Sequence, residues 1–92
     1  MPIEFDPAKS RKNAEERGMA FETAEDFEFE TAIVRQDTRK AYPEARFQGI
    51  GLIGETICFL VFTPKPDGFR VISLRKAKRK ERNEWLVSQI RK

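Results

Sequence analysis

The chain contains no histidine, a single cysteine and no long apolar segment. Histidine is the commonest general base at neutral pH and the commonest ligand of transition metals, so neither role has its usual residue here. The lone Cys58 allows no disulfide within the chain and, without histidine, no zinc site. No apolar stretch has the length of a secretory signal or a membrane span. These absences predict a cytoplasmic protein that uses no metal and no cofactor and contacts no membrane.

Positive charge is concentrated towards the end of the 92 residues, although the net charge is only +3. Residues 1–64 carry eight Lys and Arg against twelve Asp and Glu, a balance of −4. Residues 65–92 carry ten against three, a balance of +7. This asymmetry indicates a polyanionic partner, most commonly nucleic acid, with an acidic protein as the alternative. The length predicts one domain over residues 1–92.

A helix is predicted near the start of the chain. Asp6 is a favoured N-cap and Pro7 is favoured at the first helical position. The helix should run to about Arg17, where Gly18 can supply a left-handed C-terminal cap. The other elements predicted in this part are a short strand at 2–5 and a short, acidic, amphipathic helix built on Phe21, Ala24 and Phe27.

A sheet is predicted for the rest of the chain. The run Ile-Cys-Phe-Leu-Val-Phe within 56–63 is typical of a central strand buried on both faces. Gly49 and Gly51 indicate a bulge or a close approach of another segment. Short hairpin loops make consecutive strands antiparallel, so we predict an α+β fold with an antiparallel sheet of about four to five strands, two N-terminal helices and one C-terminal helix. The remaining predicted strands are 32–37, 44–53 and 69–75, and the last helix is 78–90.

The last predicted strand leads into a dense basic segment. Alternation predicts that Arg75 shares a face with Val71 and that Arg70 lies on the opposite face. A cluster of so many cations repels itself, which indicates an anionic partner; a solvated basic helix is the alternative. The cations of the segment are Arg75, Lys76, Lys78, Arg79, Lys80 and Arg82.

Cationic groups suit one class of chemistry better than others. No phosphate-binding glycine loop, paired-carboxylate motif or Ser/His/Asp set is present. In metal-independent RNA cleavage the 2′-hydroxyl attacks the adjacent phosphorus, and the protein stabilises charge on the phosphoryl oxygens. Arginine suits this task because its planar fork binds phosphate bidentately and stays charged. For the general base, the options are Glu44, Tyr42 and a lysine with a lowered pKa.

Four motifs in order give the chain a resemblance to a known family. The motifs are Phe5-Asp6-Pro7-Ala8-Lys9 with Asn13; Gly18-Met19-Ala20-Phe21 with Ala24; Tyr42-Pro43-Glu44-Ala45-Arg46-Phe47 with Ile50-Gly51; and Arg70-Val71-Ile72-Ser73-Leu74-Arg75-Lys76-Ala77 with Glu81-Arg82 and Trp85. With these motifs, the chain resembles the BrnT family over almost its whole length. This family comprises the ribonuclease toxins of a type II toxin–antitoxin system, with a RelE-like fold.

The resemblance implies a cytoplasmic toxin that cleaves RNA without a metal and inhibits translation and growth. It also implies neutralisation by a cognate BrnA-like antitoxin, a ribbon–helix–helix DNA-binding protein. The toxin–antitoxin complex would then be a hetero-oligomer that binds DNA through the antitoxin. The alternatives are a nucleic-acid-binding module without catalysis and an inactive toxin homologue that only binds an acidic partner protein.

Ten residues are predicted to form the site. Arg46 and Arg75 are the main candidates for binding the reacting phosphate, with Lys9, Glu44 and Arg17 for positioning or proton transfer. The family usually has His where this chain has Arg17; Arg stays protonated, so Arg17 fits phosphate binding and not proton transfer at neutral pH. The residues predicted to bind RNA are Arg70, Arg79, Arg82, Lys76 and Tyr42.

Overall fold

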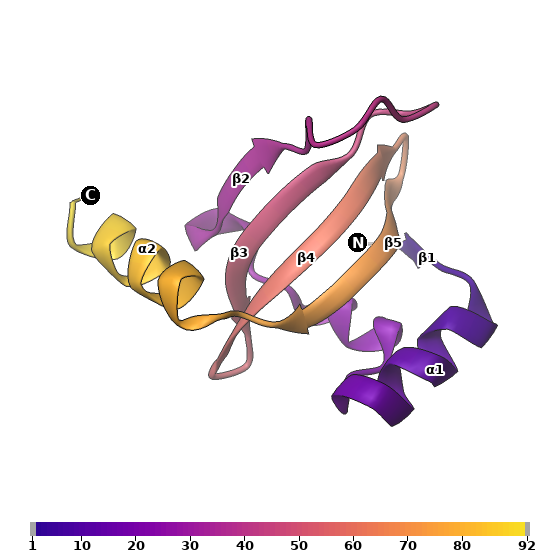
Figure 1. Cartoon of the computed structure of the whole chain (residues 1–92), viewed down its shortest axis with the longest axis horizontal. Helices are drawn as coiled ribbons and strands as arrows, with labels where there is room; N and C mark the ends of the chain where they lie inside the picture. The colour runs from indigo at the N-terminus through magenta and orange to yellow at the C-terminus, as the bar shows by residue number, and fades with distance from the viewer. Residues whose placement is uncertain (1, 92) are drawn as a thin grey trace.

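A computed structural model describes residues 2–91 of the chain (Figure 1). Five strands form one sheet in the order β1-β5-β4-β3-β2, so β4 is central. The fold is α+β, as predicted, and β4 is buried on both faces from Cys58 to Thr63, which confirms its central position. The elements are β1 (Ile3–Glu4), α1 (Pro7–Arg17), the 3₁₀-helices η1 (Phe21–Asp26) and η2 (Phe29–Thr31), β2 (Ile33–Gln36), β3 (Phe47–Ile53), β4 (Thr56–Lys65), β5 (Gly68–Lys76) and α2 (Arg79–Ile90).

The sheet is mixed, so the prediction of an antiparallel sheet is wrong at one edge. β1 pairs with β5 in parallel, with Ile3 opposite Phe69. No short hairpin joins these two strands, so nothing in the connection forces them to be antiparallel. Gly68 permits the pairing, because a Cβ at this position would lie 1.8 Å from the carbonyl oxygen of Pro2. The glycine therefore serves a close approach of two backbones, while Pro66 and Asp67 form the hairpin turn.

Only one of the two predicted N-terminal helices is an α-helix. The predicted caps of α1 are confirmed: the Asp6 side chain accepts a hydrogen bond from the Ala8 amide at 2.9 Å, and Gly18 has a φ of 71°. The second is the 3₁₀-helix η1, followed by η2. The apolar residues Phe21, Ala24 and Phe27 recur every third position, which matches the three-residue turn of a 3₁₀-helix.

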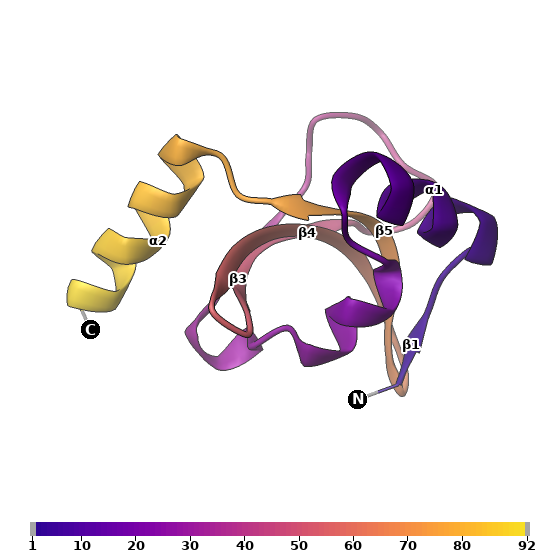
Figure 2. The same cartoon turned by 90° about the horizontal axis from the view of Figure 1, so that it is seen from below.

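The inner face of the sheet holds the main core. The sheet curves around η1, the purple segment that follows α1 (Figure 2). Phe27 lies 3.1 Å from the position of a Cβ on Gly49 and 2.9 Å from one on Gly51, so both glycines make room for its ring. The sequence predicts a bulge or a close backbone approach there, whereas the nearest atoms belong to side chains and the register of β3 with β4 is regular. Members of this core are Met19, Phe21, Ala24, Phe27, Cys58, Leu60, Phe62, Phe69, Val71 and Leu74.

Helix α2 lies on the outer face of the sheet, at one end (Figure 2). There Trp85 packs with Ile50, Phe59 and Val61 in a second, smaller core. The indole Nε1 of Trp85 donates to the carbonyl of Thr31 at 3.0 Å, which fixes the helix against the domain. We use "outer face" below for this side of the sheet, the side of Phe59 and Val61.

Helix α1 lies along the edge of β5. β1 pairs only with the first part of β5, and α1 contacts the strand beyond it. The side-chain amide of Asn13 donates to the carbonyl of Leu74 at 2.9 Å and to that of Met19 at 2.7 Å. This residue of the first motif thus ties three segments together, and the contact brings the polar side of α1 next to the outer face.

Candidate nucleic-acid interface

A bulge in β5 changes which side chains share the outer face. Val61 of β4 pairs with Ser73, whereas the next residue, Phe62, pairs with Val71, so Ile72 is an extra residue in β5. Side-chain alternation therefore restarts after the bulge. Val71 and Leu74 both lie in the inner core, although their spacing of three would place them on opposite faces of a regular strand.

The bulge brings Arg70 and Arg75 to the same face. The guanidinium of Arg75 lies 4.2 Å from the centre of the Phe59 ring, on the outer face. Arg70 pairs with Thr63, which is four residues from Phe59 on β4 and therefore points the same way. The prediction that these two arginines lie on opposite faces is wrong, because alternation assumed a regular strand.

Three residues form a row across the outer face, which we call the arginine row: Arg46, Thr63 and Arg70. Thr63 pairs with Arg70, and Arg46 precedes Phe47, which pairs with Phe62, so Arg46 lies on the other side of Thr63. Two buried polar atoms in the row, Nε of Arg46 and Oγ1 of Thr63, have no hydrogen-bond partner among residues 2–91. A buried polar group without a partner costs about 1–3 kcal/mol, so the row is a strong candidate for binding a ligand oxygen.

Arg46 is held in place by an aromatic ring. Its guanidinium carbon lies 4.1 Å from the centre of the Tyr42 ring, so the predicted candidates Tyr42 and Arg46 are in contact. Such stacking orients the guanidinium without using its N–H groups. The two residues line a cavity of about 400 Å³ together with Glu44. Glu44 is exposed and belongs to the loop between β2 and β3, so the predicted strand starts three residues too early.

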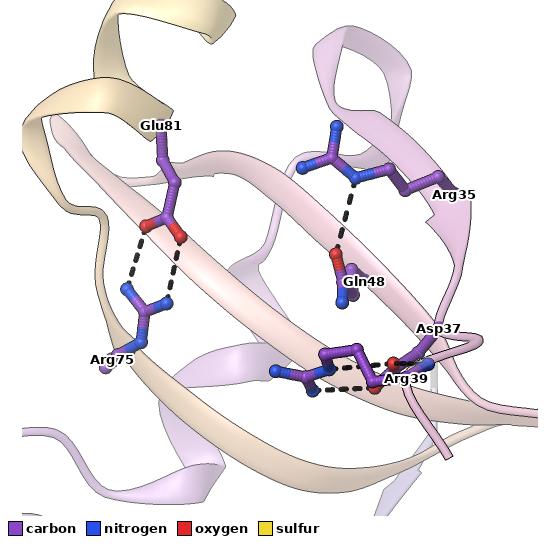
Figure 3. Close-up of polar contacts among 6 residues, drawn as sticks. All are labelled: Arg35, Asp37, Arg39, Gln48, Arg75 and Glu81. Atoms are coloured by element: carbon purple, nitrogen blue, oxygen red, sulfur yellow. Dashed lines mark hydrogen bonds and ion pairs between the residues drawn. The ribbon is translucent and has the colours of Figure 1, made fainter. Parts of the chain in front are cut away.

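Asp37, the first residue after β2, forms an ion pair with Arg39 of the same loop (Figure 3). Its buried carboxylate accepts hydrogen bonds from Nε of Arg39 at 2.8 Å and from Nη2 at 2.7 Å. Its backbone amide donates to the carbonyl of Arg46 at 2.7 Å. The hydrogen bonds from Arg39 lower the pKa of Asp37 to about 2, despite its burial. The Asp37 side chain therefore remains a carboxylate at neutral pH. The contact with Arg46 is separate, because the backbone amide of Asp37 makes it.

Arg75, at the end of β5, is paired with Glu81 of α2 (Figure 3). Its two terminal nitrogens donate to the carboxylate of Glu81 at 2.8 and 2.9 Å, and one also donates to the carbonyl of Lys76. This pairing lowers the pKa of Glu81. The Arg75 side chain is only 23% exposed, and its ion pair with Glu81 links β5 to α2. Phosphate binding by Arg75 stays a prediction and requires Glu81 to release the fork.

The other basic residues predicted to bind RNA lie around these two arginines. Arg70 pairs with Glu4 at 3.2 Å on the surface. Lys76 and Arg79 are exposed, whereas the exposed Arg82 donates to the carbonyl of Ala77 at 2.8 Å. Within the arginine row, Arg46 is therefore the arginine whose guanidinium has no carboxylate partner among residues 2–91.

Lys9 and Arg17 lie apart from Arg46. Both line a cavity of about 250 Å³ between α1 and β5, next to Ser73. Ser73 pairs with Val61, so this cavity adjoins the outer face at its α1 side. Neither residue lines the cavity around Arg46. The predicted catalytic residues thus surround the outer face in separate groups instead of forming one compact cluster.

Thr63 was missed by sequence reasoning. Thr63 is the first polar residue after the apolar run 57–62, and the sequence pattern indicates only that the buried strand ends there. The structure extends β4 to Lys65, which places the Thr63 hydroxyl inside the sheet, 5% exposed. Within the described residues, no group of His, Cys, Asp or Glu is placed to hold a metal ion, and no helix is long and apolar enough to cross a membrane.

The sequence of this chain matches one family of known proteins. No curated protein and no solved structure matches the chain. A family model described as the ribonuclease toxin BrnT of the type II toxin–antitoxin system matches residues 5–81. The match includes Arg46, Thr63, Arg70 and Arg75, and it covers most of the chain. The chain therefore belongs to the BrnT family of ribonuclease toxins.

Proposed function

We propose that this BrnT protein is a metal-independent endoribonuclease whose site is the arginine row on the outer face. Family membership supplies the reaction class. The observation that carries the location is the pair of buried, unpartnered atoms, Arg46 Nε and Thr63 Oγ1. The N–H of Arg46 Nε and the O–H of Thr63 Oγ1 can both donate to a phosphate oxygen at one place on the sheet, beside Arg70.

In this mechanism the RNA 2′-oxygen attacks the adjacent phosphorus and the 5′-oxygen of the next nucleotide leaves. The products are a 2′,3′-cyclic phosphate and a 5′-hydroxyl, with no change in oxidation state. Arg46 and Thr63 donate hydrogen bonds to the phosphoryl oxygens as their negative charge grows. Because both donor atoms are buried, the phosphate reaches them only when covering side chains move aside.

Proton transfer requires a base near the 2′-hydroxyl. Glu44 and Tyr42 line the cavity of Arg46, and Lys9 lies in the cavity beside Ser73. Glu44 is only two residues from Arg46 in the chain and is exposed, so the 2′-hydroxyl of bound RNA can reach its carboxylate. Arg17 and Arg75 are assigned to phosphate binding next to the row, and Lys76, Arg79 and Arg82 to the flanking RNA.

The biological role follows from the family. The proposed toxin is one cytoplasmic, RelE-like domain over residues 1–92 that cleaves RNA and stops translation and growth. A cognate BrnA-like antitoxin of the ribbon–helix–helix class neutralises it and binds DNA within the complex. The net charge of +7 on residues 65–92 favours a complex with an acidic segment of that antitoxin.

One observation favours a second candidate, an RNA-binding BrnT homologue without catalysis. Arg75 is already paired with Glu81, and Arg17 stands where the family usually has His. A chain with these features can still bind RNA through its surface cations. Replacing Arg17 by His tests this alternative: a gain of cleavage by the variant would show that proton transfer at this position limits the reaction.

The test compares purified variants on single-stranded RNA in excess EDTA. Arg46→Ala should lower the cleavage rate by at least about 100-fold, as for loss of a donor to a developing oxyanion. Arg46→Lys should restore only part of it, because a point charge replaces a fork. Arg11→Ala removes an equal charge from the exposed side of α1 and should change the rate less than about 3-fold.

Melting temperatures measured on the same samples separate loss of activity from loss of fold. Cleavage by Arg46→Ala at the parental rate would move the site away from the arginine row. Strict dependence on added magnesium, or products other than a cyclic phosphate and a 5′-hydroxyl, would overturn the mechanism. Binding of RNA with no cleavage by the parent chain would support the second candidate.

A further inference from the structure

Helix α2 has a second apolar side, which is exposed to solvent. Its packed side carries Trp85, and Gln89 donates to the carbonyl of Thr31 at 2.9 Å. Three apolar residues lie elsewhere on the helix and are exposed: Leu86 by 50%, Val87 by 45% and Ile90 by 82%. Ile90 is three residues from Val87 and four from Leu86, so the three side chains form one stripe.

The stripe borders a groove between α2 and β2. The groove has a volume of about 870 Å³, and Val87 contributes to both the stripe and the groove. Its apolar part is Ile33 and Val87, and its basic residues are Arg35, Lys80 and Arg91. The one acid in the lining, Glu84, is paired with Arg35 at 2.7 Å. The site thus combines an apolar floor with a basic rim.

We propose that this groove and stripe bind an acidic amphipathic helix of the antitoxin. This inference rests on the proposed function, because it requires the chain to be a toxin with a protein antitoxin. A helix that lies in a groove presents apolar anchors at spacings of three and four residues. These anchors can pack against the stripe of Leu86, Val87 and Ile90. Acidic residues flanking those anchors would meet Lys80 and Arg91.

Charge argues against a second copy of this chain as the occupant. Residues 65–92 carry a net charge of +7, so two copies joined through α2 would bring like charges together. The same charge attracts an acidic helix. In addition, the match to the family model ends at residue 81, so the stripe lies outside the part shared with that model. A surface in this position suits the recognition of one particular antitoxin.

Calorimetric titration with the antitoxin encoded in the same operon, purified alone, tests the inference. The double substitution Leu86→Ser with Val87→Ser should weaken binding by at least 10-fold. Val34→Ser is the matched control, because Val34 has the same 45% exposure on β2 but points away from its groove-lining neighbours Ile33 and Arg35. The control should change affinity less than 2-fold, and neither variant should lower the melting temperature substantially.

Charge reversal provides the second arm. Lys80→Glu with Arg91→Glu should weaken binding by at least 10-fold at low salt, and less at high salt, if acidic residues of the antitoxin face the rim. Unchanged affinity in the Leu86/Val87 variant would overturn the inference, as would a dimer of the chain alone that this variant dissociates. The readout is binding, so a parent chain that binds through α2 but cleaves no RNA would contradict the proposed function and leave this inference standing.

Discussion

Phe62 and Thr63 are neighbours on β4, yet they belong to parts of the molecule with different physical requirements. Phe62 points into the inner core and stacks on Phe47 at 6.0 Å between ring centres. Thr63 points to the outer face, where its hydroxyl has no hydrogen-bond partner among residues 2–91. The inner face is filled with apolar groups, whereas the outer face keeps polar groups that are not fully satisfied.

The comparison separates stability from function along one strand. Close packing on the inner face leaves no room to change side-chain volume without a cost. On the outer face two arginines are paired with acids, Arg75 with Glu81 and Arg70 with Glu4, whereas Arg46 has no carboxylate partner among residues 2–91. Unsatisfied polar groups lower stability, so a protein retains them where they serve binding or catalysis. Substitutions on the two faces should therefore have opposite profiles.

The largest difference is expected between Phe62→Ala and Thr63→Val. Phe62→Ala should lower the free energy of unfolding by about 3–5 kcal/mol, since it opens a cavity in the core. Thr63→Val should leave stability unchanged or raise it by about 1 kcal/mol, because it replaces a buried unpaired hydroxyl by a methyl group of similar size. Cleavage by Thr63→Val should fall at least 10-fold. Urea unfolding and RNA cleavage on the same samples measure both effects.

Two outcomes would break the comparison between the faces. A strongly destabilised Thr63→Val protein would show that the hydroxyl has a structural partner. A stable variant with parental cleavage would remove Thr63 from the site and leave Arg46 to be judged alone.

Local signals made much of the fold predictable. Asp6 and Gly18 define α1 because their capping chemistry acts within one turn of the helix. The apolar run of β4 predicts a central strand because both of its faces need cover. The parallel pairing of β1 was not predictable in this way, since it depends on a contact between Pro2 and Gly68, which are far apart in the sequence.

The candidate site was predictable only in part. The motif residues Tyr42 and Arg46 do meet, because they are close in the chain. The bulge at Ile72 has no signal in the sequence, and without it Arg70 and Arg75 were assigned to opposite faces. The pairing of Arg75 with Glu81 depends on the angle at which α2 leaves the sheet, which residue types alone do not define.

An intermediate effect is expected for Arg75→Ala, which tests whether a cation of the outer face is structural. The substitution removes both hydrogen bonds from Arg75 to the carboxylate of Glu81, which then keeps the one from the Lys78 amide, so it should cost about 1.5–3 kcal/mol, the range for hydrogen bonds to charged groups. This corresponds to a fall of about 6–24 °C in melting temperature, at about 4–8 °C per kcal/mol.

The double variant Arg75→Ala with Glu81→Gln should recover part of the loss, since the amide oxygen of Gln still accepts from the Lys78 amide and no charge remains without its partner. A cost below about 0.5 kcal/mol, as for ordinary surface changes, would mean that the pair is unimportant for the fold. In that case, an accompanying loss of cleavage would assign Arg75 to phosphate binding alone.

Two glycines of β3 sharpen the description of the inner face. A Cβ on Gly51 would lie 2.9 Å from both Phe27 and Ala32, and one on Gly49 would lie 3.1 Å from Phe27. Gly51→Ala should therefore cost about 1–3 kcal/mol through overpacking, and Gly49→Ala less. Thermal melts give the order. Equal and negligible costs would show that Phe27 moves aside freely and that the inner face is loosely packed.

The smallest effect concerns Asp37, which belongs to the outer face but acts on its stability. Its folded-state pKa of about 2 lies below the ordinary value of 3.8. Protonation therefore favours the unfolded chain: the carboxylate contributes fully above about pH 5, and its contribution is lost as the pH falls from about 4 to about 2. The Arg39 side chain is 61% exposed, so we expect an effect of at most about 1 kcal/mol.

Asp37→Asn isolates this contribution, because the amide cannot titrate. The parent should melt at a slightly higher temperature than Asp37→Asn at pH 6, and the difference should vanish near pH 2. The backbone amide of residue 37 still donates to the carbonyl of Arg46 in the variant, so RNA cleavage at pH 6 should stay close to the parental rate. A difference in melting temperature that is independent of pH would show that Asp37 acts through loop packing, and the outer face would then owe nothing to this ion pair.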